Sequence, residues 1–558
     1  MSYKDEYKRW LAAVGEDDLR TELINMNEAA IEDAFYRDLA FGTGGLRGII
    51  GAGTNRMNVH VVSKASQGLS QYLKTTTSDP SVVIGYDSRI KSDVFARTAA
   101  CVFAANGIQV HIWSELNPVP SVSFAVRELG ASAGIMITAS HNPSKYNGYK
   151  VYGSDGCQIT TEAAASILAE IQNVDIFNGI TTESFEEFMS IGKIDYIRQS
   201  VMDRFIKSVK SQSVLFGDEV NRDIAIVYSP LNGTGLKPVT RVLEESGFTN
   251  ITVVEEQKLP DGNFPTCPYP NPEIRDAMEL GLQYCKKSGS DLLLATDPDA
   301  DRCGIAVRDG EDYRLLSGNE VGLLMLNYIC SQKQKHGKMP AHPVFIKTIV
   351  TMDLSEKIAD HYGVQTINVL TGFKFIGEII GKLEQSGRVY DYICGFEESY
   401  GYLTGSYVRD KDAVNAAFII CEMFAYYKTR GISLLDKLNE LYATYGYCMN
   451  TLHSYEFPGS SGMEKMKSIM TDFHKGLSSI AGYSITRTED YSTGLNGLPK
   501  SDVLKFFYEG DNVNGSVVIR PSGTEPKLKA YISITTDDKD SAADIECKIV
   551  ADIEAKLQ

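Results

Sequence analysis

Long apolar runs and paired cysteines are both missing from this 558-residue sequence. No stretch offers the ~18 uninterrupted apolar residues of a membrane span, and the charged first ten residues leave no apolar core for a signal peptide. The ten cysteines form no Cys-x-x-Cys pair and several lie in apolar runs, so we expect reduced thiols in the core. These absences predict a cytoplasmic protein that has no membrane partner.

Positive charge is scarce as well: 55 Lys and Arg face 72 Asp and Glu, for a formal net charge of −17. A nucleic-acid-binding surface needs dense Lys and Arg, so no nucleic-acid partner is expected, although a small cationic pocket remains compatible with this charge. The chain is 43% hydrophobic and can therefore form cores. At ~150 residues per domain its length predicts three or four domains, and no motif fixes an oligomeric state.

The order of apolar and polar segments predicts α/β layers over most of the chain. After a helical start over residues 3–39, short apolar runs recur, each followed by a polar loop or by helical spacing. The expected strands are 81–86, 109–113, 134–138, 223–228, 291–295 and 343–348. After about residue 450 the pattern changes to strands at 452–457, 516–520 and 528–535 with helices at 463–480 and 545–557. This last part predicts an α+β domain, and in the α/β part ligands gather at the carboxyl ends of strands.

Three carboxylates, Asp297, Asp299 and Asp301, stand at alternate positions after an expected buried strand. So much like charge in one loop is costly unless a cation binds there. The spacing is that of an EF-hand opening, but Arg302 and Arg308 occupy the positions that need Gly and Glu. Mg²⁺, which prefers oxygen ligands, is the better prediction, with a solvated acidic turn as the alternative.

Ser140 lies in a turn of small residues, Thr138 to Pro143, directly after another expected strand. Its hydroxyl could act as a nucleophile or carry a phosphate, although Ser-His is also common in ordinary turns. The neighbours do not form Gly-x-Ser-x-Gly, so a lipase-type elbow is unsupported. His141 beside Ser140 proves little, because base action depends on geometry.

Other polar loops could bind a phosphorylated sugar. The segment from Arg520 to Lys527 combines hydroxyls, accessible backbone and positive charge, which can cradle a phosphate; a plain hairpin is the equal alternative. Glu397 and Glu398 could accept hydrogen bonds from sugar hydroxyls or open a helix. There is no Walker A motif, and the Gly-rich stretches lack the third glycine of a dinucleotide fingerprint.

Taken together, these loops resemble the motifs of the α-D-phosphohexomutases, particularly those of phosphoglucomutases and the branch that includes phosphopentomutase-like enzymes. Several independent motifs in family order make coincidence improbable. The motifs are Phe41-Gly-Thr-Gly-Gly-Leu-Arg-Gly48, Thr138-Ala-Ser-His-Asn-Pro143, Asn147-Gly-Tyr-Lys150, Asp297-Pro-Asp-Ala-Asp-Arg302, Thr371-Gly-Phe-Lys374, Glu397-Glu-Ser399 and Arg520-Pro-Ser-Gly-Thr-Glu-Pro526.

The resemblance implies an α/β protein of four domains around a central cleft. The first three would have mixed-sheet α/β/α cores, and the fourth would be a smaller α+β domain. The expected domains are 1–205 with the phosphoserine loop, 206–320 with the metal loop, 321–448 with the sugar-binding loop and 449–558 with the phosphate-binding loop.

The resemblance also implies residue roles. Ser140 would carry the phosphate, and Ser140 with Asp297, Asp299 and Asp301 would hold one Mg²⁺. The residues expected around the transferring group are Arg47, His141, Lys150 and Arg302, with Lys150 the first choice of proton acceptor and His141 the second. The residues expected to bind substrate are Thr371, Gly372, Lys374, Glu397, Ser399, Lys411, Arg520, Ser522, Gly523 and Thr524.

The activity implied is that of a phosphoglucomutase-type isomerase, which interconverts hexose 1- and 6-phosphates through a phosphoserine and a glucose 1,6-bisphosphate intermediate. Phosphomannomutase and phosphopentomutase activities are alternatives, because the elements around 371–374 and 395–398 resemble the phosphopentomutase-like branch. A Mg²⁺-dependent sugar phosphatase and a non-catalytic sugar-phosphate binder are further alternatives, and the presence of Ser140 with all three aspartates disfavours the binder.

Overall fold

The computed structural model describes residues 2–42, 44–180, 182–457, 459–521 and 527–557. These residues form two compact units, each taken from several stretches of chain. Unit 1 comprises the residues up to Leu316 together with Ile376–Tyr392 and Tyr400–Tyr426. Unit 2 comprises Ser317–Phe375, Ile393–Ser399 and the residues from Tyr427 on.

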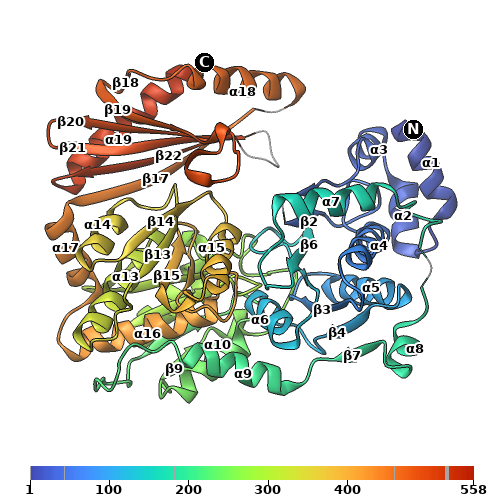
Figure 1. The fold of residues 1–558 in the computed structure, drawn as a ribbon, viewed down its shortest axis with the longest axis horizontal. Coiled ribbons are helices and arrows are strands. Elements are labelled where there is room, and N and C mark those ends of the chain that lie inside the picture. Colours follow the sequence, from blue (N-terminus) through green and yellow to red (C-terminus); the bar gives the residue numbers. More distant parts are fainter. Residues whose placement is uncertain (1, 43, 181, 458, 522–526, 558) are drawn as a thin grey trace. The chain divides into compact units, whose positions relative to one another are not determined.

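Three short helices open unit 1, where the sequence predicted one helical region over residues 3–39 (Figure 1). Ser2 begins the first of them through a reciprocal capping box with Asp5. Trp10 is fully buried and packs edge-on against Phe35, with 5.7 Å between the ring centroids. The helices are α1 (Tyr3–Ala13), α2 (Asp17–Asn25) and α3 (Glu28–Phe35), and extended residues at their ends interrupt the predicted region.

A mixed seven-stranded sheet, in the order β1-β2-β6-β5-β3-β4-β7, forms the middle of the N-terminal part of unit 1. β3 runs parallel to β4 and β5, whereas β6 is antiparallel to β5 and β2. The strands are β1 (Phe41–Gly42), β2 (Gly45–Ile49), β3 (Ser81–Tyr86), β4 (Gln109–Ile112), β5 (Ala133–Ile137), β6 (Tyr146–Gly153) and β7 (Ile194–Tyr196).

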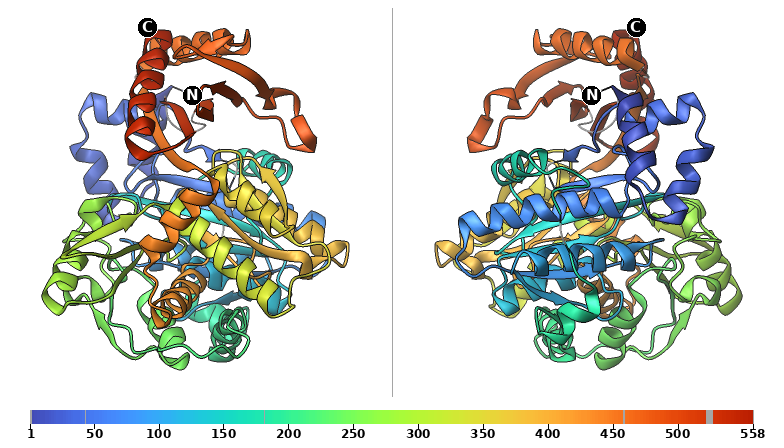
Figure 2. Two further views of the ribbon diagram at one scale, coloured as in Figure 1. Left: turned by 90° about the vertical axis from the view of Figure 1, so that its left-hand side faces the viewer. Right: turned by 90° about the vertical axis from the view of Figure 1, so that its right-hand side faces the viewer.

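Helices cover both faces of this sheet because side chains alternate along each strand. Val82 and Ile84 of β3 belong to the core that also holds side chains of α4 and α5. Gly85 points to the opposite face, where a Cβ would contact Val122 of α6. The helices are α4 (Val59–Thr76), α5 (Ser92–Ala105), α6 (Val119–Leu129), α7 (Thr161–Gln172), α8 (Phe185–Ser190) and α9 (Gln199–Lys210), and Figure 2 shows α4 beside α5.

A second mixed sheet of unit 1, in the order β12-β11-β10-β8-β9, carries the triple-aspartate loop. β8 is parallel to β9 and β10, and β10 turns back into antiparallel β11. The strands are β8 (Ile226–Ser229), β9 (Ile251–Val253), β10 (Leu292–Thr296), β11 (Cys303–Asp309) and β12 (Asp312–Leu316). The helices are α10 (Leu236–Glu245), α11 (Glu255–Lys258) and α12 (Arg275–Ser288).

Three elements cross from one unit to the other along the chain: α15 (Phe373–Gln385), β15 (Tyr392–Glu397) and α16 (Ala413–Thr429). The short η1 (Val389–Asp391) and β16 (Gly401–Leu403) lie wholly in unit 1. In unit 2, β13 and β14 pair in parallel, and the Ser317 side chain caps a long helix through a capping box with Glu320. The remaining elements are α13 (Gly318–Lys335), β13 (Val344–Thr348), α14 (Leu354–His361), β14 (Gln365–Val369) and α17 (Leu434–Tyr445).

The C-terminal part of unit 2 is an antiparallel six-stranded sheet in the order β17-β22-β21-β20-β19-β18. Val517 and Ile532 face the core shared with α18 and α19, whereas Val518 and Tyr531 face Ile349 in a separate apolar cluster. The strands are β17 (Tyr447–Glu456), β18 (Ser479–Ile480), β19 (Tyr483–Asp490), β20 (Leu504–Gly510), β21 (Val513–Pro521) and β22 (Lys527–Thr536). The helices are α18 (Gly459–His474), η2 (Tyr491–Thr493), η3 (Leu495–Gly497) and α19 (Lys539–Leu557).

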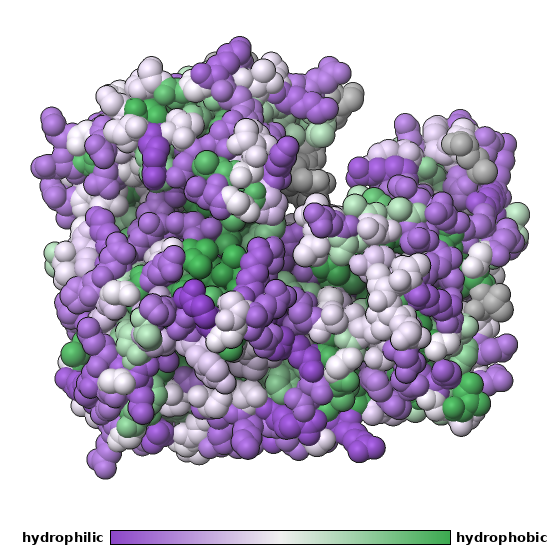
Figure 3. Space-filling view, in the orientation of Figure 1, coloured by the Kyte–Doolittle hydropathy of each residue, from purple (hydrophilic) through white to green (hydrophobic). Residues whose placement is uncertain are grey.

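This architecture confirms the predicted fold class of mixed α/β sheets followed by a smaller α+β part. The helix expected over 463–480 ends at His474, and Ser479–Ile480 instead form β18. β6 was not among the expected strands. Of the ten cysteines, eight are buried, Cys101 is half-buried and Cys547 is exposed. The apolar runs around several of them had predicted thiols in the core. The face shown in Figure 3 is mostly hydrophilic. No helix within the described ranges has the length and apolar character needed to cross a membrane.

Candidate active site

The Ser140 turn follows β5, whose five residues are all buried, and it holds Ser140 in an unusual conformation. Ser140 has a φ of 54°, in the left-handed region that side chains other than glycine rarely adopt. The Thr138 hydroxyl accepts a hydrogen bond from the Ser140 amide at 2.8 Å and donates one to Asp299 Oδ2 at 3.1 Å. Thr138 therefore ties the serine turn to the loop of aspartates.

The Ser140 hydroxyl faces an acid and an imidazole. Its Oγ donates to Asp297 Oδ2 at 3.1 Å and lies 3.2 Å from His141 Nδ1. Burial lowers the pKa of His141 well below its usual range, and the charges of Arg302 and Arg47 lower it further. The imidazole beside Ser140 is therefore held neutral, with a lone pair able to accept a proton.

The three aspartates lie on the loop between β10 and β11, with one oxygen of each within 4.8 Å of the others. All three are buried. Asp297 Oδ1 accepts the backbone amides of Asp301 and Arg302, each at 3.0 Å. By contrast, Asp299 Oδ1 and Asp301 Oδ1 are buried and accept no hydrogen bond from the residues that the structure describes. Buried carboxylate oxygens left in this way fit a divalent cation, which prefers hard oxygen ligands.

Electrostatics separates the aspartates from one another. Burial raises the pKa of Asp297 well above its usual range, and the neighbouring carboxylates Asp299 and Asp301 raise it further. Burial also disfavours charge on Asp301, but Lys411 and Lys150 outweigh it and lower the pKa of Asp301. The nearby lysines and arginine therefore do not balance the negative charge around Asp297. Such an excess of negative charge is a further feature of a cation site.

Close backbone packing fixes the aspartate loop against the loop after β8 and the start of α6. A Cβ at Gly233, in the loop after β8, would lie 2.4 Å from Pro298 Cα, so only glycine fits there. Thr234 donates both its amide and its hydroxyl to the Pro298 carbonyl, at 2.8 and 3.0 Å. The amide of Val119, at the start of α6, donates to the Asp299 carbonyl at 2.9 Å.

Two lysine side chains contact Asp299 and Asp301 of the aspartate loop. Lys150 Nζ donates to Asp299 Oδ2 at 2.9 Å and to Asp301 Oδ2 at 3.2 Å. Burial disfavours the Lys150 ammonium, but the two carboxylates outweigh this and raise the pKa of Lys150. The Lys150 ammonium is therefore paired with two carboxylates, and the expected order of Lys150 and His141 as proton acceptors stays a prediction.

Lys411 lies against the aspartate loop, with its Nζ 3.2 Å from Asp301 Oδ2. The sequence placed it among the substrate-binding residues without indicating this contact. Buried neighbours fix its loop, because the Tyr152 hydroxyl donates to Asp410 and Arg409 donates to Glu384 at 2.8 Å.

The two predicted arginines lie at the edge of the same group. Arg302 Nε is 4.0 Å from Asp297 Oδ2, and its guanidinium forms an ion pair with Glu273. Arg47 is exposed and donates to the Asn142 side chain in the Ser140 turn at 3.3 Å. Unit 1 therefore brings together every residue that was expected around the transferring group.

The predicted sugar-binding residues belong to unit 2. Thr371, Gly372 and Lys374 lie at the junction of β14 and α15, and Glu397 is the last residue of β15. The Gly372 amide donates to Glu397 Oε1 at 3.0 Å, and Gly372 has a φ of 124° that favours glycine. Thr371 Oγ1 is buried and has no hydrogen-bond partner in the described part of the chain, which leaves it able to bind a substrate hydroxyl.

Glu398 is held by two hydroxyls that the sequence did not single out. Its Oε2 accepts hydrogen bonds from Thr348 and Thr351, both at 3.3 Å. Neither glutamate opens a helix: Glu397 ends a strand and Glu398 begins a turn, with Ser399 half-buried beside it.

Arg520 lies near the end of β21, opposite Lys529 of β22. Tyr531, on the same sheet, is close to both Arg520 and Glu398: burial and Glu398 raise the pKa of Tyr531 to about 12, and Arg520 opposes them. Unit 2 thus groups Arg520 with the two glutamates through one tyrosine. Ser522, Gly523 and Thr524 lie outside the described residues.

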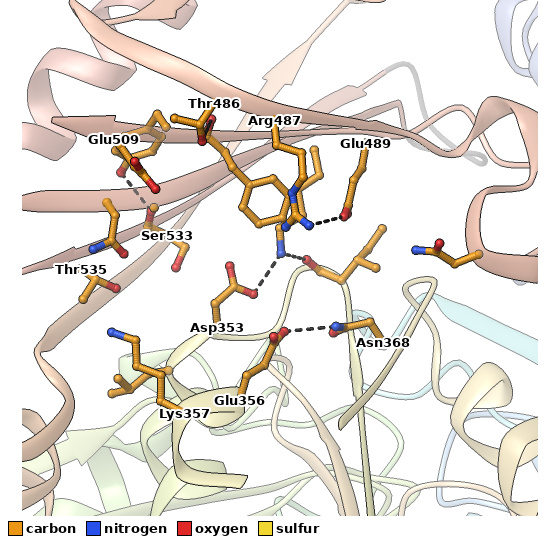
Figure 4. Close-up of a pocket in the computed structure, with 18 of the residues that line it drawn as sticks. Asp353, Glu356, Lys357, Asn368, Thr486, Arg487, Glu489, Glu509, Ser533 and Thr535 are labelled. Carbon is orange, nitrogen blue, oxygen red and sulfur yellow. Dashed lines mark hydrogen bonds and ion pairs between the residues drawn. The ribbon is translucent and has the colours of Figure 1, made fainter. Parts of the chain in front are cut away.

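A separate cavity of about 420 Å³ lies within unit 2, between α14 and the C-terminal sheet (Figure 4). Of the predicted site residues that the structure describes, none lines this cavity. At its inner end Asp353 Oδ1 accepts from Lys347 and Lys505, both at 2.9 Å, and Oδ2 accepts from Ser516 at 3.0 Å. This carboxylate joins the α14 region to the C-terminal sheet.

Sequence reasoning assigned no role to Thr138, the first residue of the Ser140 turn, or to Arg89, which contacts that turn directly. Both stand in the polar stretches immediately after strands, where functional side chains were sought. Their partners, however, are a carboxylate 161 residues away and backbone carbonyls, and no local pattern identifies such contacts.

Four family models match the chain in order. They are the phosphoglucomutase/phosphomannomutase alpha/beta/alpha domains I (residues 38–176), II (203–310) and III (317–445) and the C-terminal domain (501–551). A phosphoglucomutase of Staphylococcus saprophyticus is 36% identical over 544 residues, covering 95% of this chain and 97% of the relative. The chain belongs to the phosphoglucomutase/phosphomannomutase family. It is an isomerase of the phosphohexomutase type.

Solved structures agree with this family fold. A putative phosphomannomutase of Thermus thermophilus has a TM-score of 0.69 at 20% identity, with 93% of this chain and 99% of that chain covered. An N-acetylphosphoglucosamine mutase of Aspergillus fumigatus, in complex with GlcNAc-6P and magnesium, has a TM-score of 0.53 at 13% identity, with 98% and 100% covered. The family's four matched segments follow the order of the four expected domains.

Proposed function

We propose that the protein interconverts α-D-glucose 1-phosphate and glucose 6-phosphate, with Ser140 as the phosphate carrier and glucose 1,6-bisphosphate as the intermediate. The observation that carries the proposal is the Ser140 hydroxyl, hydrogen-bonded to Asp297 within a buried triple-aspartate group. The family membership and the phosphoglucomutases among the relatives support glucose as the sugar.

Ser140, Asp297, Asp299 and Asp301 are the proposed Mg²⁺ ligands. The fit rests on an oxygen-only donor set and on two buried carboxylate oxygens that accept no hydrogen bond within the described ranges of the chain. When bound, Mg²⁺ supplies neutralisation for phosphate charge in a reaction that depends mainly on positioning and electrostatics. Magnesium in the Aspergillus relative's structure supports this choice of ion.

In the proposed reaction the bond between phosphorus and Ser140 Oγ breaks while a sugar hydroxyl oxygen bonds to phosphorus. His141, 3.2 Å from Oγ, can accept the proton of the attacking hydroxyl and return it to Ser140 Oγ, which leaves as a hydroxyl. Arg47 and Arg302 face the transferring charge, while Lys150 and Lys411 fix the aspartates. After the bisphosphate reorients, its other phosphate returns to Ser140 and regenerates the phosphoenzyme.

Apart from Lys411, which belongs to unit 1, the described substrate-binding residues of the proposal belong to unit 2. Thr371, Gly372 and Lys374, with Glu397 and Ser399, would bind the sugar hydroxyls, and the buried Thr371 hydroxyl supports this role. Arg520 with Ser522, Gly523 and Thr524 would bind the phosphate that is not reacting. These residues can bind the bisphosphate in either orientation, because the sugar hydroxyls that they contact are similarly placed in both. We also propose the domain limits 1–205, 206–320, 321–448 and 449–558.

One assay tests the proposal. The protein is incubated with Mg²⁺, trace glucose 1,6-bisphosphate and the 1-phosphate of glucose, mannose or ribose, and both isomer and inorganic phosphate are followed. We expect the highest kcat/KM with glucose 1-phosphate and little free phosphate. A preference for mannose 1-phosphate would point to the other activity that the family description names, and phosphate release without isomer would indicate a phosphatase.

Ser140→Ala tests the phosphate carrier. This variant should lose turnover and should take up no label from ³²P-labelled bisphosphate, because the acceptor oxygen is gone. Ser144→Ala, in the same loop, is the matched control and should retain both. Mutase turnover undiminished in Ser140→Ala would refute the phosphoserine route.

A further inference from the structure

Arg89 is buried beneath the Ser140 turn and takes no part in the functions described so far. It follows β3 in the polar segment Asp87-Ser-Arg89, and its side chain has no exposed surface. Nη1 donates to the carbonyls of Pro143 and Tyr146, at 3.0 and 3.1 Å. Nη2 donates to the carbonyls of Ser140 and Asn142.

Three of the acceptors, Ser140, Asn142 and Pro143, belong to the turn that carries the phosphate acceptor, and the fourth, Tyr146, begins β6 just after it. Ser140 has a positive φ, a conformation that persists only where the surroundings impose it. A planar guanidinium can bind several carbonyls at fixed angles, whereas an ammonium carries three donors on one atom. One side chain therefore binds four main-chain carbonyls, of which that of Pro143 also accepts the Tyr146 amide at 3.0 Å.

The guanidinium is itself fixed on two sides. Nε lies 3.4 Å from Asp87 Oδ2, and Asp87 Oδ1 accepts the Arg89 amide at 2.9 Å and the Ser92 hydroxyl at 2.8 Å. The ring of Phe264 stacks against it, with Cζ 5.1 Å from the centroid. Arg89 is therefore a rigid support and not a mobile surface cation.

We propose that Arg89 is the positioning residue of the phosphoserine turn, and that it controls whether the phosphate passes to sugar or to water. This inference rests on the proposed phosphoserine function. In the unwanted reaction a water oxygen bonds to phosphorus, the bond to Ser140 Oγ breaks, inorganic phosphate leaves and the hydroxyl is restored. The hydrogen bonds from Arg89 hold the turn so that Oγ points at Asp297. A loosened turn would expose the phosphate to water.

The test compares Arg89→Lys and Arg89→Met with Arg97→Met, which removes an exposed arginine of α5 that pairs with Glu186 on the surface. In both Arg89 variants we expect kcat to fall about 10- to 100-fold. The KM for glucose 1-phosphate should stay within about threefold, because the proposed sugar-binding residues are untouched. The ratio of inorganic phosphate to isomer should rise about fivefold or more, with lysine the milder change. Arg97→Met should match the wild type.

Hydrogen exchange supplies a readout that does not depend on activity. Amides in residues 138–148 should exchange about tenfold faster in Arg89→Met and at the wild-type rate in Arg97→Met. If the wild type shows no mutase activity but the turn still exchanges faster in Arg89→Met, the proposed function is wrong and the positioning role of Arg89 stands. Unchanged exchange and an unchanged phosphate-to-isomer ratio in folded Arg89 variants would overturn the inference.

Phe264→Leu covers the case in which neither Arg89 variant folds. It removes the stacked ring and leaves every carbonyl acceptor in place, so a smaller shift in the same phosphate-to-isomer ratio is expected. A ratio equal to that of the wild type would overturn the inference.

Discussion

The three carboxylates of the aspartate loop differ in their hydrogen bonds, although their spacing in the sequence is regular. Asp297 is held by two backbone amides and the Ser140 hydroxyl. Asp299 and Asp301 each keep one buried oxygen without a hydrogen bond among the described residues. The last two are therefore the oxygens that a bound cation would satisfy best.

Asp299→Asn should weaken Mg²⁺ binding and lower kcat/KM about 100-fold at limiting Mg²⁺, because one carboxylate charge is lost from the site. A Mg²⁺ titration of activity measures the shift, with Asp309→Asn, exposed at the end of β11, as the control. An Mg²⁺ dependence identical to that of the wild type would argue against the metal site.

His474 gives a prediction of pH dependence. It lies between Asp502 at 2.9 Å and Asp490 at 3.1 Å, and hydrogen bonding to Asp502 chiefly raises its pKa above the usual 6.5. A raised folded-state pKa adds stability that is fully present below pH ~6.5 and is lost as the pH rises through the folded-state value. The Tm difference between the wild type and His474→Gln should therefore be larger at about pH 5.5 than at about pH 8.5. An equal Tm difference at both pH values would contradict this prediction.

At the scale of elements, strands were predictable where apolar runs are continuous, as in Ser81–Tyr86, which matches β3 residue for residue. β6 was not predicted, because buried Asn147 and Lys150 interrupt its apolar pattern. Those side chains are buried only because Ile90 and the aspartates, distant in sequence, satisfy them. The candidate site followed the same rule: its chemistry could be predicted from motifs, whereas the contacts of Arg89 and Thr138 depend on tertiary structure.

Gly233→Ala should displace the aspartate loop, because the new Cβ would meet the Pro298 backbone at 2.4 Å. We expect a folded protein with weaker Mg²⁺ activation and about tenfold lower kcat. Gly15→Ala is the control, since no atom lies within 4 Å of its added Cβ. Equal Mg²⁺ activation in both variants would show that the loop tolerates the methyl group.

Asp353 joins α14 to the C-terminal sheet as one acceptor for two buried lysines. The charges of Lys347 and Lys505 outweigh burial and lower the pKa of Asp353. Asp353→Asn should destabilise unit 2 by about 3 kcal/mol, because both ammonium groups then lose their shared counter-charge. Urea unfolding measures the change, with exposed Asp360→Asn on the same helix as the control. A loss under about 1 kcal/mol would contradict this account.

For the whole molecule, the two units should respond separately to Mg²⁺, since the aspartates belong to unit 1. Binding at 100 times Kd adds ~2.7 kcal/mol to the unit that holds the ion. Calorimetry should show one transition that rises with Mg²⁺ and another that Asp353→Asn lowers. Equal movement of both transitions with Mg²⁺ would contradict the assignment.

The chain leaves unit 1 after Leu316 and returns to it twice, through Ile376–Tyr392 and Tyr400–Tyr426. Four domains in sequence order are thus interlaced into two units. Cutting the gene at residue 320 would yield an N-terminal fragment that contains Ser140 and all three aspartates but lacks Lys411, the cation 3.2 Å from Asp301. Unit 1 is therefore not encoded by one contiguous stretch, and a fragment cut there separates the aspartates from a cation that contacts them.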